Sequence, residues 1–231
     1  MIGRYRWAAA QARFRRRLDA GGAGTAKSAG VFITRAPARF LPLGRSSPMT
    51  LVAIAPPEFD VALQLAYATA ENFTGRPVYG RAAAYLHPIA AAHLKRAIEG
   101  AAALGLRLVV FDAFRPSEAQ WALWNFRPDP TFLADPRRGS PHSRGVAVDL
   151  SLLDRAGRPL DMGTAFDAFT PLSHHARTDV PADAQRNRLL LMGLMTAAGW
   201  DFYRNEWWHY QLFDARRFAL IGDADLPRPM M

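Results

Sequence analysis

The sequence predicts a single domain in which helices cover a sheet. Residues 88–104 place apolar side chains at helical spacing and end at Gly105, which is typical of an amphipathic helix with a glycine stop. Residues 106–111 form a short run rich in apolar side chains, as a buried strand does, and residues 146–152 alternate between two faces, as a strand does. A helix with one apolar face must bury it, so we expect the helix to lie on this sheet.

Length and composition limit the class of protein. The chain has 231 residues, of which 50% are hydrophobic, and this is enough for one sizeable core. No run of about 18 uninterrupted apolar residues is present, so we expect no membrane span. There is no cysteine, which excludes disulfides and thiolate metal sites. Any metal must therefore be held by His, Asp or Glu.

The net charge of +9 is concentrated at the N-terminus. Residues 1–48 contain ten basic residues and one acid, Asp19, so residues 49–231 carry 19 basic and 19 acidic residues. A protein that binds nucleic acid by charge should carry its basic patch on the folded domain. The neutral body therefore argues against a nucleic-acid partner.

Three interpretations of residues 1–48 are open. The segment can be an Arg-rich, acid-poor targeting sequence, a disordered arm, or an upstream extension with Met49 as the true start. We expect residues 1–48 to be a basic, disordered N-terminal extension and residues 49–231 to be the functional domain. We expect the protein in the cytoplasm, with the periplasm as an alternative, and the sequence leaves the oligomeric state undetermined.

Turn residues and periodicity set the expected order of elements. The elements are an apolar run at 51–55, a strand or turn-rich segment at 61–69, a helix at 88–104, a strand at 106–111, a helix at 117–126, a loop at 127–141, a strand at 146–152, a turn at 154–157, an apolar helix from 183 to 198 and a strand at 205–212. For the first helix we predict a buried face formed by Ile89, Leu94, Ile98 and Ala102. For the second, we predict a capping box that begins at Ser117 and ends at Gln120.

One half of a metal site is indicated between residues 139 and 149. His142 lies in a turn rich in Gly, Ser and Pro, and the strand that follows puts Val146, Val148, Leu150 and Leu152 on one face. Asp149 lies on the other face, between the small residues Ala147 and Ser151, which leaves room for a guest beside the carboxylate. Zinc accepts imidazole nitrogen and carboxylate oxygen together.

The other half is indicated at residues 205–212. Glu206 and His209 are three apart, a spacing that places them on opposite faces of a regular strand, so Glu206 must sit at a bend before the strand if both are to reach one metal. A hydrolytic zinc needs three protein ligands, an open position for water and a carboxylate that takes the proton. His142, Asp149 and His209 provide the ligands, and Glu206 the base.

Each of these residues also has a purely structural interpretation. His209 can be a hydrogen-bonded core residue and Asp149 a satisfied structural carboxylate. Arg115, which follows the strand at 106–111 and emerges from the edge of the sheet, can be the partner in a surface ion pair. His174 and His175 can be ligands, although adjacent histidines in a polar loop more often support ligands or face solvent. The two histidines not yet mentioned, His87 and His93, belong to a helix region and are interpreted as structural.

Several short motifs together resemble one known family. They are Tyr-Ala-Thr and Asn-Phe-Thr-Gly within 67–75, Asp-x-x-Arg-Pro at 112–116, Ser-x-His-Ser-Arg-Gly-x-Ala-x-Asp at 140–149, Met-Gly, Phe-Asp and Ser-His-His within 162–175, and Glu-Trp-Trp-His-Tyr at 206–210. This arrangement resembles the D-alanyl-D-alanine dipeptidases of the VanX type, from about Tyr67 to Leu212. Pro141 departs from the Ser or Thr common before the histidine, and residues 1–48 have no counterpart.

The resemblance implies a role for each matching residue. His142, Asp149 and His209 correspond to the ligands of one zinc ion, Glu206 to the catalytic base and Arg115 to a residue that stabilises the transition state. Positions that line the dipeptide pocket correspond to Tyr67, Asp112, Ser140 and Asp167. Of these, Asp167 is suited to bind the free α-ammonium group of a dipeptide.

The resemblance also implies the fold and the reaction. The fold is α+β, a single domain with a central antiparallel sheet flanked by helices and a zinc cleft, and the reaction is hydrolysis of D-alanyl-D-alanine in cell-wall metabolism. Alternatives are a zinc D,D-carboxypeptidase or L,D-endopeptidase acting on peptidoglycan peptides, or a non-catalytic zinc module of the Hedgehog type. The presence of both Glu206 and Arg115 favours turnover over the last of these.

Overall fold

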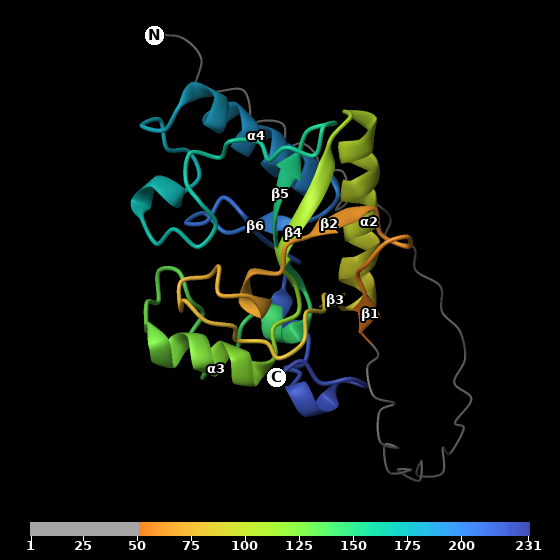
Figure 1. Ribbon diagram of the computed structural model, residues 1–231, viewed down its shortest axis with the longest axis vertical. Coiled ribbons are helices and arrows are strands. Elements are labelled where there is room, and N and C mark those ends of the chain that lie inside the picture. Colours follow the sequence, from red (N-terminus) through yellow and green to blue (C-terminus); the bar gives the residue numbers. More distant parts are fainter. Residues whose placement is uncertain (1–50) are drawn as a thin grey trace, which may run out of the picture. The chain divides into compact units, whose positions relative to one another are not determined.

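A five-stranded sheet forms the centre of the computed structural model, which describes residues 51–231 (Figure 1). Its strand order is β2-β4-β5-β7-β6, and a second sheet pairs β1 with β3. The elements are β1 (Val52–Ala53), β2 (Val61–Leu63), β3 (Tyr85–Leu86), α2 (Pro88–Ala103), β4 (Arg107–Asp112), α3 (Ser117–Phe126), β5 (Ala147–Leu153), α4 (Ala182–Ala197), β6 (Asp201–Phe202) and β7 (His209–Gln211). Segment 1–48, with its three interpretations, lies outside the described residues.

The central sheet is antiparallel except at one edge. Strands β4, β5, β7 and β6 pair antiparallel, as the resemblance implied, whereas β2 pairs parallel with β4. The chain reaches β4 from β2 through helix α2, and such a crossover returns a strand in the direction of the first one. Parallel pairing at this edge therefore follows from the helix between the two strands.

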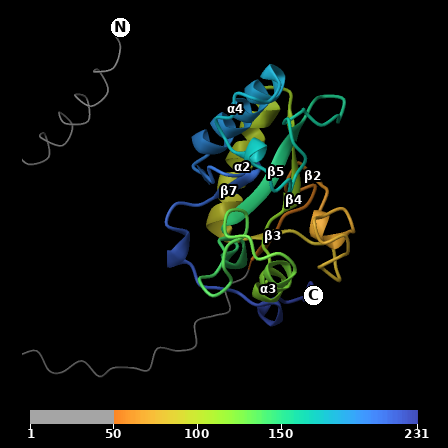
Figure 2. The ribbon, with the colours of Figure 1, turned by 90° about the vertical axis from the view of Figure 1, so that its left-hand side faces the viewer.

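Helices α2 and α4 pack together on one face of the sheet (Figure 2). The predicted buried face of α2 is wrong in part: Ile89 and Ala102 are exposed, and the helix buries Leu94 with four alanines, Ala90, Ala91, Ala97 and Ala101. Small side chains let the helix axis approach its neighbours closely. A pattern weighted by side-chain size selects isoleucine before alanine, and this is why it misplaced the face.

Strand β5 separates the two faces of the sheet as predicted. Val148, Leu150 and Leu152 belong to the apolar cluster under α2 and α4, while Asp149 points to the opposite face. Both faces of β5 are buried. The face away from the helices is therefore covered by other parts of the chain, and the charged side chains of the candidate site lie there.

Helix α3 lies apart from α2 and α4 and has a second apolar cluster beneath it (Figure 1). The capping box predicted for this helix is wrong. Pro116 is the N-cap residue and Ser117 is already helical, so its hydroxyl donates instead to the carbonyl of Ile221. Gln120, the expected end of the box, accepts a hydrogen bond from Arg115.

The last strand is shorter than predicted. β7 spans only His209–Gln211, and residues 204–208 form the turn that joins it to β6. Glu206 lies within this turn, at the bend that the predicted metal site required. None of the helices between residues 51 and 231 combines the length and apolarity that a bilayer crossing needs.

Candidate active site

A cavity of about 220 Å³ opens on the sheet face that α2 and α4 leave uncovered. Eight of the nine residues predicted for the site line it: Tyr67, Arg115, Ser140, His142, Asp149, Asp167, Glu206 and His209. These residues come from segments far apart in the sequence. Strand pairing contributes directly to the convergence, because Asp112, Asp149 and His209 occupy one row across β4, β5 and β7.

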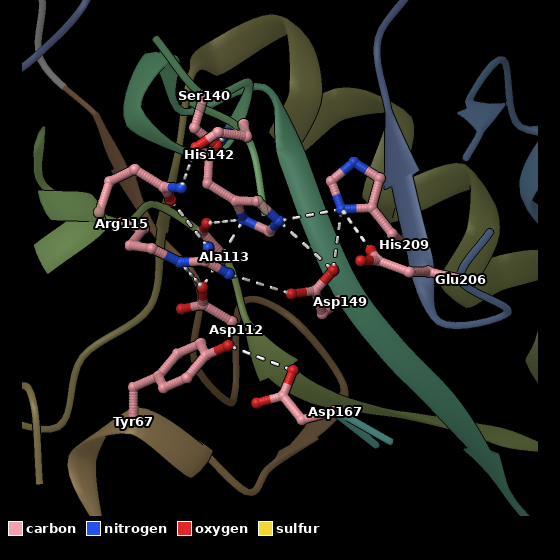
Figure 3. Close-up of polar contacts among 12 residues, drawn as sticks. Tyr67, Asp112, Ala113, Arg115, Ser140, His142, Asp149, Asp167, Glu206 and His209 are labelled. Carbon is pink, nitrogen blue, oxygen red and sulfur yellow. Dashed lines mark hydrogen bonds and ion pairs between the residues drawn. The ribbon is translucent and has the colours of Figure 1, made fainter. Parts of the chain in front are cut away.

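Three residues of the cavity lining that can donate an electron pair to a metal ion, the donor group His142, Asp149 and His209, bring their ligand atoms close together (Figure 3). His142 Nε2 lies 3.1 Å from His209 Nδ1 and 3.3 Å from Asp149 Oδ1, and the last two atoms are 3.1 Å apart. Four ligands at roughly 2.0–2.2 Å around a tetrahedral zinc would be about 3.3–3.6 Å from one another. The observed triangle therefore has nearly the dimensions of one face of a zinc coordination tetrahedron.

In each of the two imidazole rings, His142 and His209, the nitrogen outside the triangle makes a hydrogen bond. This leaves the lone pair of the other nitrogen directed into the triangle. His142 Nδ1 lies 2.6 Å from the carbonyl oxygen of Ala113, and His209 Nε2 lies 3.2 Å from Gln211 Oε1, so each of these nitrogens carries the proton. The opposite nitrogens, His142 Nε2 and His209 Nδ1, are then acceptors, like the carboxylate of Asp149. Three acceptors at this separation repel one another unless a cation lies among them, so the residues fit a bound metal ion.

Glu206 lies beside this group without belonging to it. Its Oε2 is 3.9 Å from His209 Nδ1, and its side chain is almost fully buried. Burial, followed by the charges of Asp149 and Asp167, raises the pKa of Glu206 well above its usual value, and Arg115 only partly offsets this. A carboxylate in this state accepts a proton readily, and a bound cation nearby would favour its ionised form.

Arg115 is held on three sides. Its Nε donates to Asp112 Oδ2 at 2.8 Å and its Nη1 to Gln120 Oε1 at 2.9 Å, while Nη2 lies 3.4 Å from Asp149 Oδ2. The guanidinium also lies over the ring of Tyr67, 4.9 Å from its centroid. Only 4% of Arg115 is exposed, so its position relative to Asp149 is fixed by these contacts.

Asp112 does not line the cavity, unlike the other predicted residues. The register between β4 and β5 shifts after Val110, which turns Asp112 to the same side as Asp149, where it accepts hydrogen bonds from Arg115 and from the Tyr79 hydroxyl at 2.8 Å. Irregularities of this kind re-aim side chains near functional sites. Asp112 is placed to orient Arg115 and does not reach the cavity.

A second polar pair lies at another part of the cavity (Figure 3). The Tyr67 hydroxyl donates to Asp167 Oδ1 at 3.2 Å, and the buried Oδ2 of Asp167 has no hydrogen-bond partner among the described residues. Burial, followed by the charge of Asp149, raises the pKa of Asp167 to about 8. Ser140 Oγ accepts a hydrogen bond from the His142 backbone and so supports the turn that carries this histidine.

Comparisons with known proteins identify the family. Residues 48–224 match the model of peptidase family M15, described as D-ala-D-ala dipeptidase. The chain belongs to this family. It is 44% identical over 164 residues to the D-alanyl-D-alanine dipeptidase of Escherichia coli, a match that covers 71% of this chain and 85% of that relative.

Two other relatives with the same name are also similar. The Streptomyces coelicolor protein is 37% identical over 63% of this chain and 83% of its own length, and the Enterococcus faecalis protein is 34% identical over 64% and 84%. A solved structure of the VanY D,D-pentapeptidase in complex with Zn(II) covers 74% of this chain and 90% of its own. Its TM-score of 0.38 and 13% identity are too low to support a statement about function.

The remaining histidines of this M15 chain lie outside the donor group. His87 caps α2 by accepting from the Ile89 backbone, and His93 Nδ1 lies 3.1 Å from the Gly199 carbonyl, so both are structural, as expected. His174 and His175 are not in the donor group found among residues 51–231. Burial, followed by the charge of Arg188, lowers the pKa of His175 to about 4.

Sequence reasoning missed several residues of the site. Gln211 could have been found, because it lies two residues after His209 on one strand and therefore shares its face. Gln120 was noted, but as a helix cap. Loop residues of the cavity carried no signal, since their side chains are ordinary and their position depends on the fold; they are Pro130, Phe132, Leu133 and Ala134.

Proposed function

We propose that the protein is a zinc-dependent dipeptidase that hydrolyses D-alanyl-D-alanine to two molecules of D-alanine. The observation that carries this proposal is the convergence of three acceptor atoms beside Glu206 and Arg115 in one small cavity. Membership of the M15 family supports the substrate, and the geometry supports the assignment of roles. A cytoplasmic location stays a prediction.

One zinc ion would be held by His142, Asp149 and His209. When bound, zinc lowers the pKa of its water to about 7 and polarises the carbonyl of the scissile peptide bond. The protein supplies the second layer of contacts that fixes the ligands. Ala113 and Gln211 hold the two imidazole rings in the tautomers that offer lone pairs to the ion.

Glu206 would act as the general base and then as the general acid. It takes a proton from the attacking water as the water oxygen bonds to the carbonyl carbon, and it delivers that proton to the amine nitrogen as the C–N bond breaks. The raised pKa of Glu206 suits the first half of this exchange, because it makes the carboxylate a stronger base toward the water proton than a carboxylate with a usual pKa. Its position outside the donor group leaves it free for this task.

Arg115 would stabilise the negative charge that develops on the carbonyl oxygen. The guanidinium is fixed by Asp112 and Gln120 before substrate arrives, so little reorganisation is needed during the reaction. The ion pair with Asp149 is long, at 3.4 Å, and involves only Nη2. Arg115 lines the cavity, so this amino group would be available to donate to an oxygen next to the proposed metal site.

Asp167 and the size of the cavity would select the dipeptide. One oxygen of Asp167 has no partner within residues 51–231 and can accept from an α-ammonium group, whose positive charge would stabilise the ionised carboxylate. Tyr67 holds the other oxygen in place. A volume of about 220 Å³ is below the roughly 300–1,000 Å³ of pockets for drug-sized ligands. Longer peptides, which lack a free ammonium group at this position, would fit poorly.

The decisive experiment compares three substrates with zinc-loaded protein. We expect hydrolysis of D-alanyl-D-alanine, and little or none of L-alanyl-L-alanine or of a pentapeptide ending in D-alanyl-D-alanine. Release of one D-alanine from the pentapeptide at a comparable rate would identify a D,D-carboxypeptidase instead. Stoichiometric zinc without cleavage of any peptide would favour a binding module.

A further inference from the structure

The motif Ser173-His174-His175 is not used by the proposed mechanism, yet it lies directly against the turn that carries Glu206. The backbone N–H of His175 donates to the carbonyl of Arg204 at 2.9 Å, and the N–H of Trp207 donates to the carbonyl of Ser173 at 3.0 Å. These two hydrogen bonds flank Glu206 on either side in the sequence. They fix the backbone of the turn independently of any contact that the Glu206 side chain makes.

Side-chain hydrogen bonds also connect the Glu206 turn with the loop that carries Asp167. The indole N–H of Trp207 donates to Thr164 Oγ1 at 2.8 Å, and Thr164 Oγ1 lies 3.1 Å from Ser173 Oγ. Ser173 Oγ in turn donates to the carbonyl of Ala168 at 2.6 Å. The loop 162–175, which carries Asp167, is thereby joined to the Glu206 turn by one continuous set of hydrogen bonds.

Arg188 of α4 binds this loop from the side of the helices. Its Nε donates to the carbonyl of Met162 at 2.6 Å, and its Nη1 lies 2.8 Å from the carbonyl of Leu172 and 3.2 Å from that of His174. Two of these carbonyls flank Ser173, and the third is at the start of the loop. One guanidinium therefore holds both ends of loop 162–175.

The environment of Arg188 is unusual for a residue with only a packing role. It is 4% exposed, and its hydrogen bonds end on main-chain carbonyls, with no carboxylate of residues 51–231 in an ion pair with it. Burying a charge without a charged partner is costly, and an apolar side chain would fill the same space at lower cost. The planar fork that reaches several carbonyls at fixed angles is specific to arginine.

We propose that Arg188 is a positioning residue that sets the places of Glu206 and Asp167 through loop 162–175. Arg188 does not line the cavity, so it acts only through other residues. The inference rests on the proposed function, in which Glu206 transfers the proton and Asp167 binds the α-ammonium group of the dipeptide. Displacement of catalytic groups by about 1 Å can lower a rate about 10²-fold.

The test compares Arg188→Met and Arg188→Lys with Arg186→Met. Arg186 is a matched control, since it lies on the same helix but is exposed and pairs with the exposed Asp183. We expect Arg188→Met to keep its zinc, to lower kcat about 10²-fold and to raise KM. Arg188→Lys should be nearly as impaired, because one ammonium group cannot span the three carbonyls. The control should stay within about twofold of the wild type.

A double mutant separates positioning from a general loss of stability. If Arg188 acts on kcat through Glu206, adding Arg188→Met to Glu206→Gln should lower the remaining kcat by only about fivefold or less. A full additional 10²-fold loss would contradict the inference. So would a kcat for Arg188→Lys equal to that of the wild type, since charge alone would then suffice.

A milder variant covers the case in which Arg188→Met fails to fold. Thr164→Val removes the acceptor of the Trp207 indole at the other end of the same network, and it should lower kcat roughly fivefold, the equivalent of one hydrogen bond. The proposal would be overturned if Thr164→Val and Arg188→Lys both had a kcat within twofold of the wild-type value. A wild type without any hydrolysis would instead contradict the proposed function.

Discussion

The two faces of the central sheet have opposite chemistry although they share the same strands. On the helix-covered face, Leu150 of β5 and Tyr210 of β7 lie in an apolar cluster and are fully buried. On the other face, the neighbouring residues Asp149 and His209 meet in a polar group that is buried almost as deeply. One residue along a strand therefore separates the hydrophobic core from the proposed metal site.

This difference shows how the fold tolerates charges that are costly to bury. The apolar face supplies the hydrophobic stabilisation, and charges on the polar face are held by specific partners where these are present, as Arg115 is by Asp112 and Gln120. Substitutions on the two faces should then have different signatures. Those on the polar face should remove activity and leave the fold intact, and those on the apolar face should do the reverse.

The largest effect is expected for the proposed zinc ligands. His142→Ala and Asp149→Ala each remove one of three donors, so we expect loss of zinc and activity at the background level. Metal analysis after dialysis, together with circular dichroism, checks this. Full zinc occupancy in both variants would contradict the ligand assignment, and Ser151→Ala, on the same face of β5, is the control.

Glu206→Gln should retain zinc but lose most hydrolysis. General acid and base catalysis typically contributes 10²–10⁴-fold, so we expect kcat to fall by about that factor. Thermal stability should stay the same or rise, because burial already favours the neutral form of Glu206 and glutamine is neutral. Metal analysis is the critical control, since loss of zinc in this variant would make Glu206 a ligand.

Arg115→Ala should lower kcat more than it raises KM. Removal of one donor to a developing oxyanion typically costs about 10²–10³-fold in kcat. Steady-state kinetics with D-alanyl-D-alanine give both constants separately. If only KM changed, Arg115 would belong to substrate binding and the polar face would contain no transition-state donor of this kind.

The apolar face is tested by Leu150→Ala. This residue is fully buried, so the variant should lose about 2–5 kcal/mol of unfolding free energy. The kcat per folded, zinc-loaded molecule should stay within about twofold, because Asp149 is held in place by the backbone pairing of β5 with β7. Denaturant unfolding and kinetics below the melting transition measure the two quantities. A large fall in kcat at full folding would show that the two faces are not independent.

The sequence predicted the candidate site residues on the polar face better than the contacts that hold them in place. Alternation along β5 indicated the orientation of Asp149, and the spacing of Glu206 and His209 required the bend that the structure contains. The role of Gln120, five residues after Arg115, was missed because this residue was assigned to the helix cap. The register shift that turns Asp112 toward Arg115 could not be predicted, because it depends on how two distant strands pair. The alanine-rich face of α2 was missed for a similar reason, since close packing favours small residues that hydrophobicity patterns undervalue.

The smallest effect is expected from removal of residues 1–48. Residues 1–48 carry the whole net charge, include the run Gly21-Gly22-Ala23-Gly24, which disfavours a continuous helix, and end where the family match begins. We therefore expect a protein that starts at Met49 to keep its melting temperature within a few degrees and its activity within about twofold. Any binding of the full chain to DNA or anionic lipid should weaken with salt and vanish with the segment. A shortened protein that is unfolded or inactive would show that residues 1–48 stabilise one of the two faces.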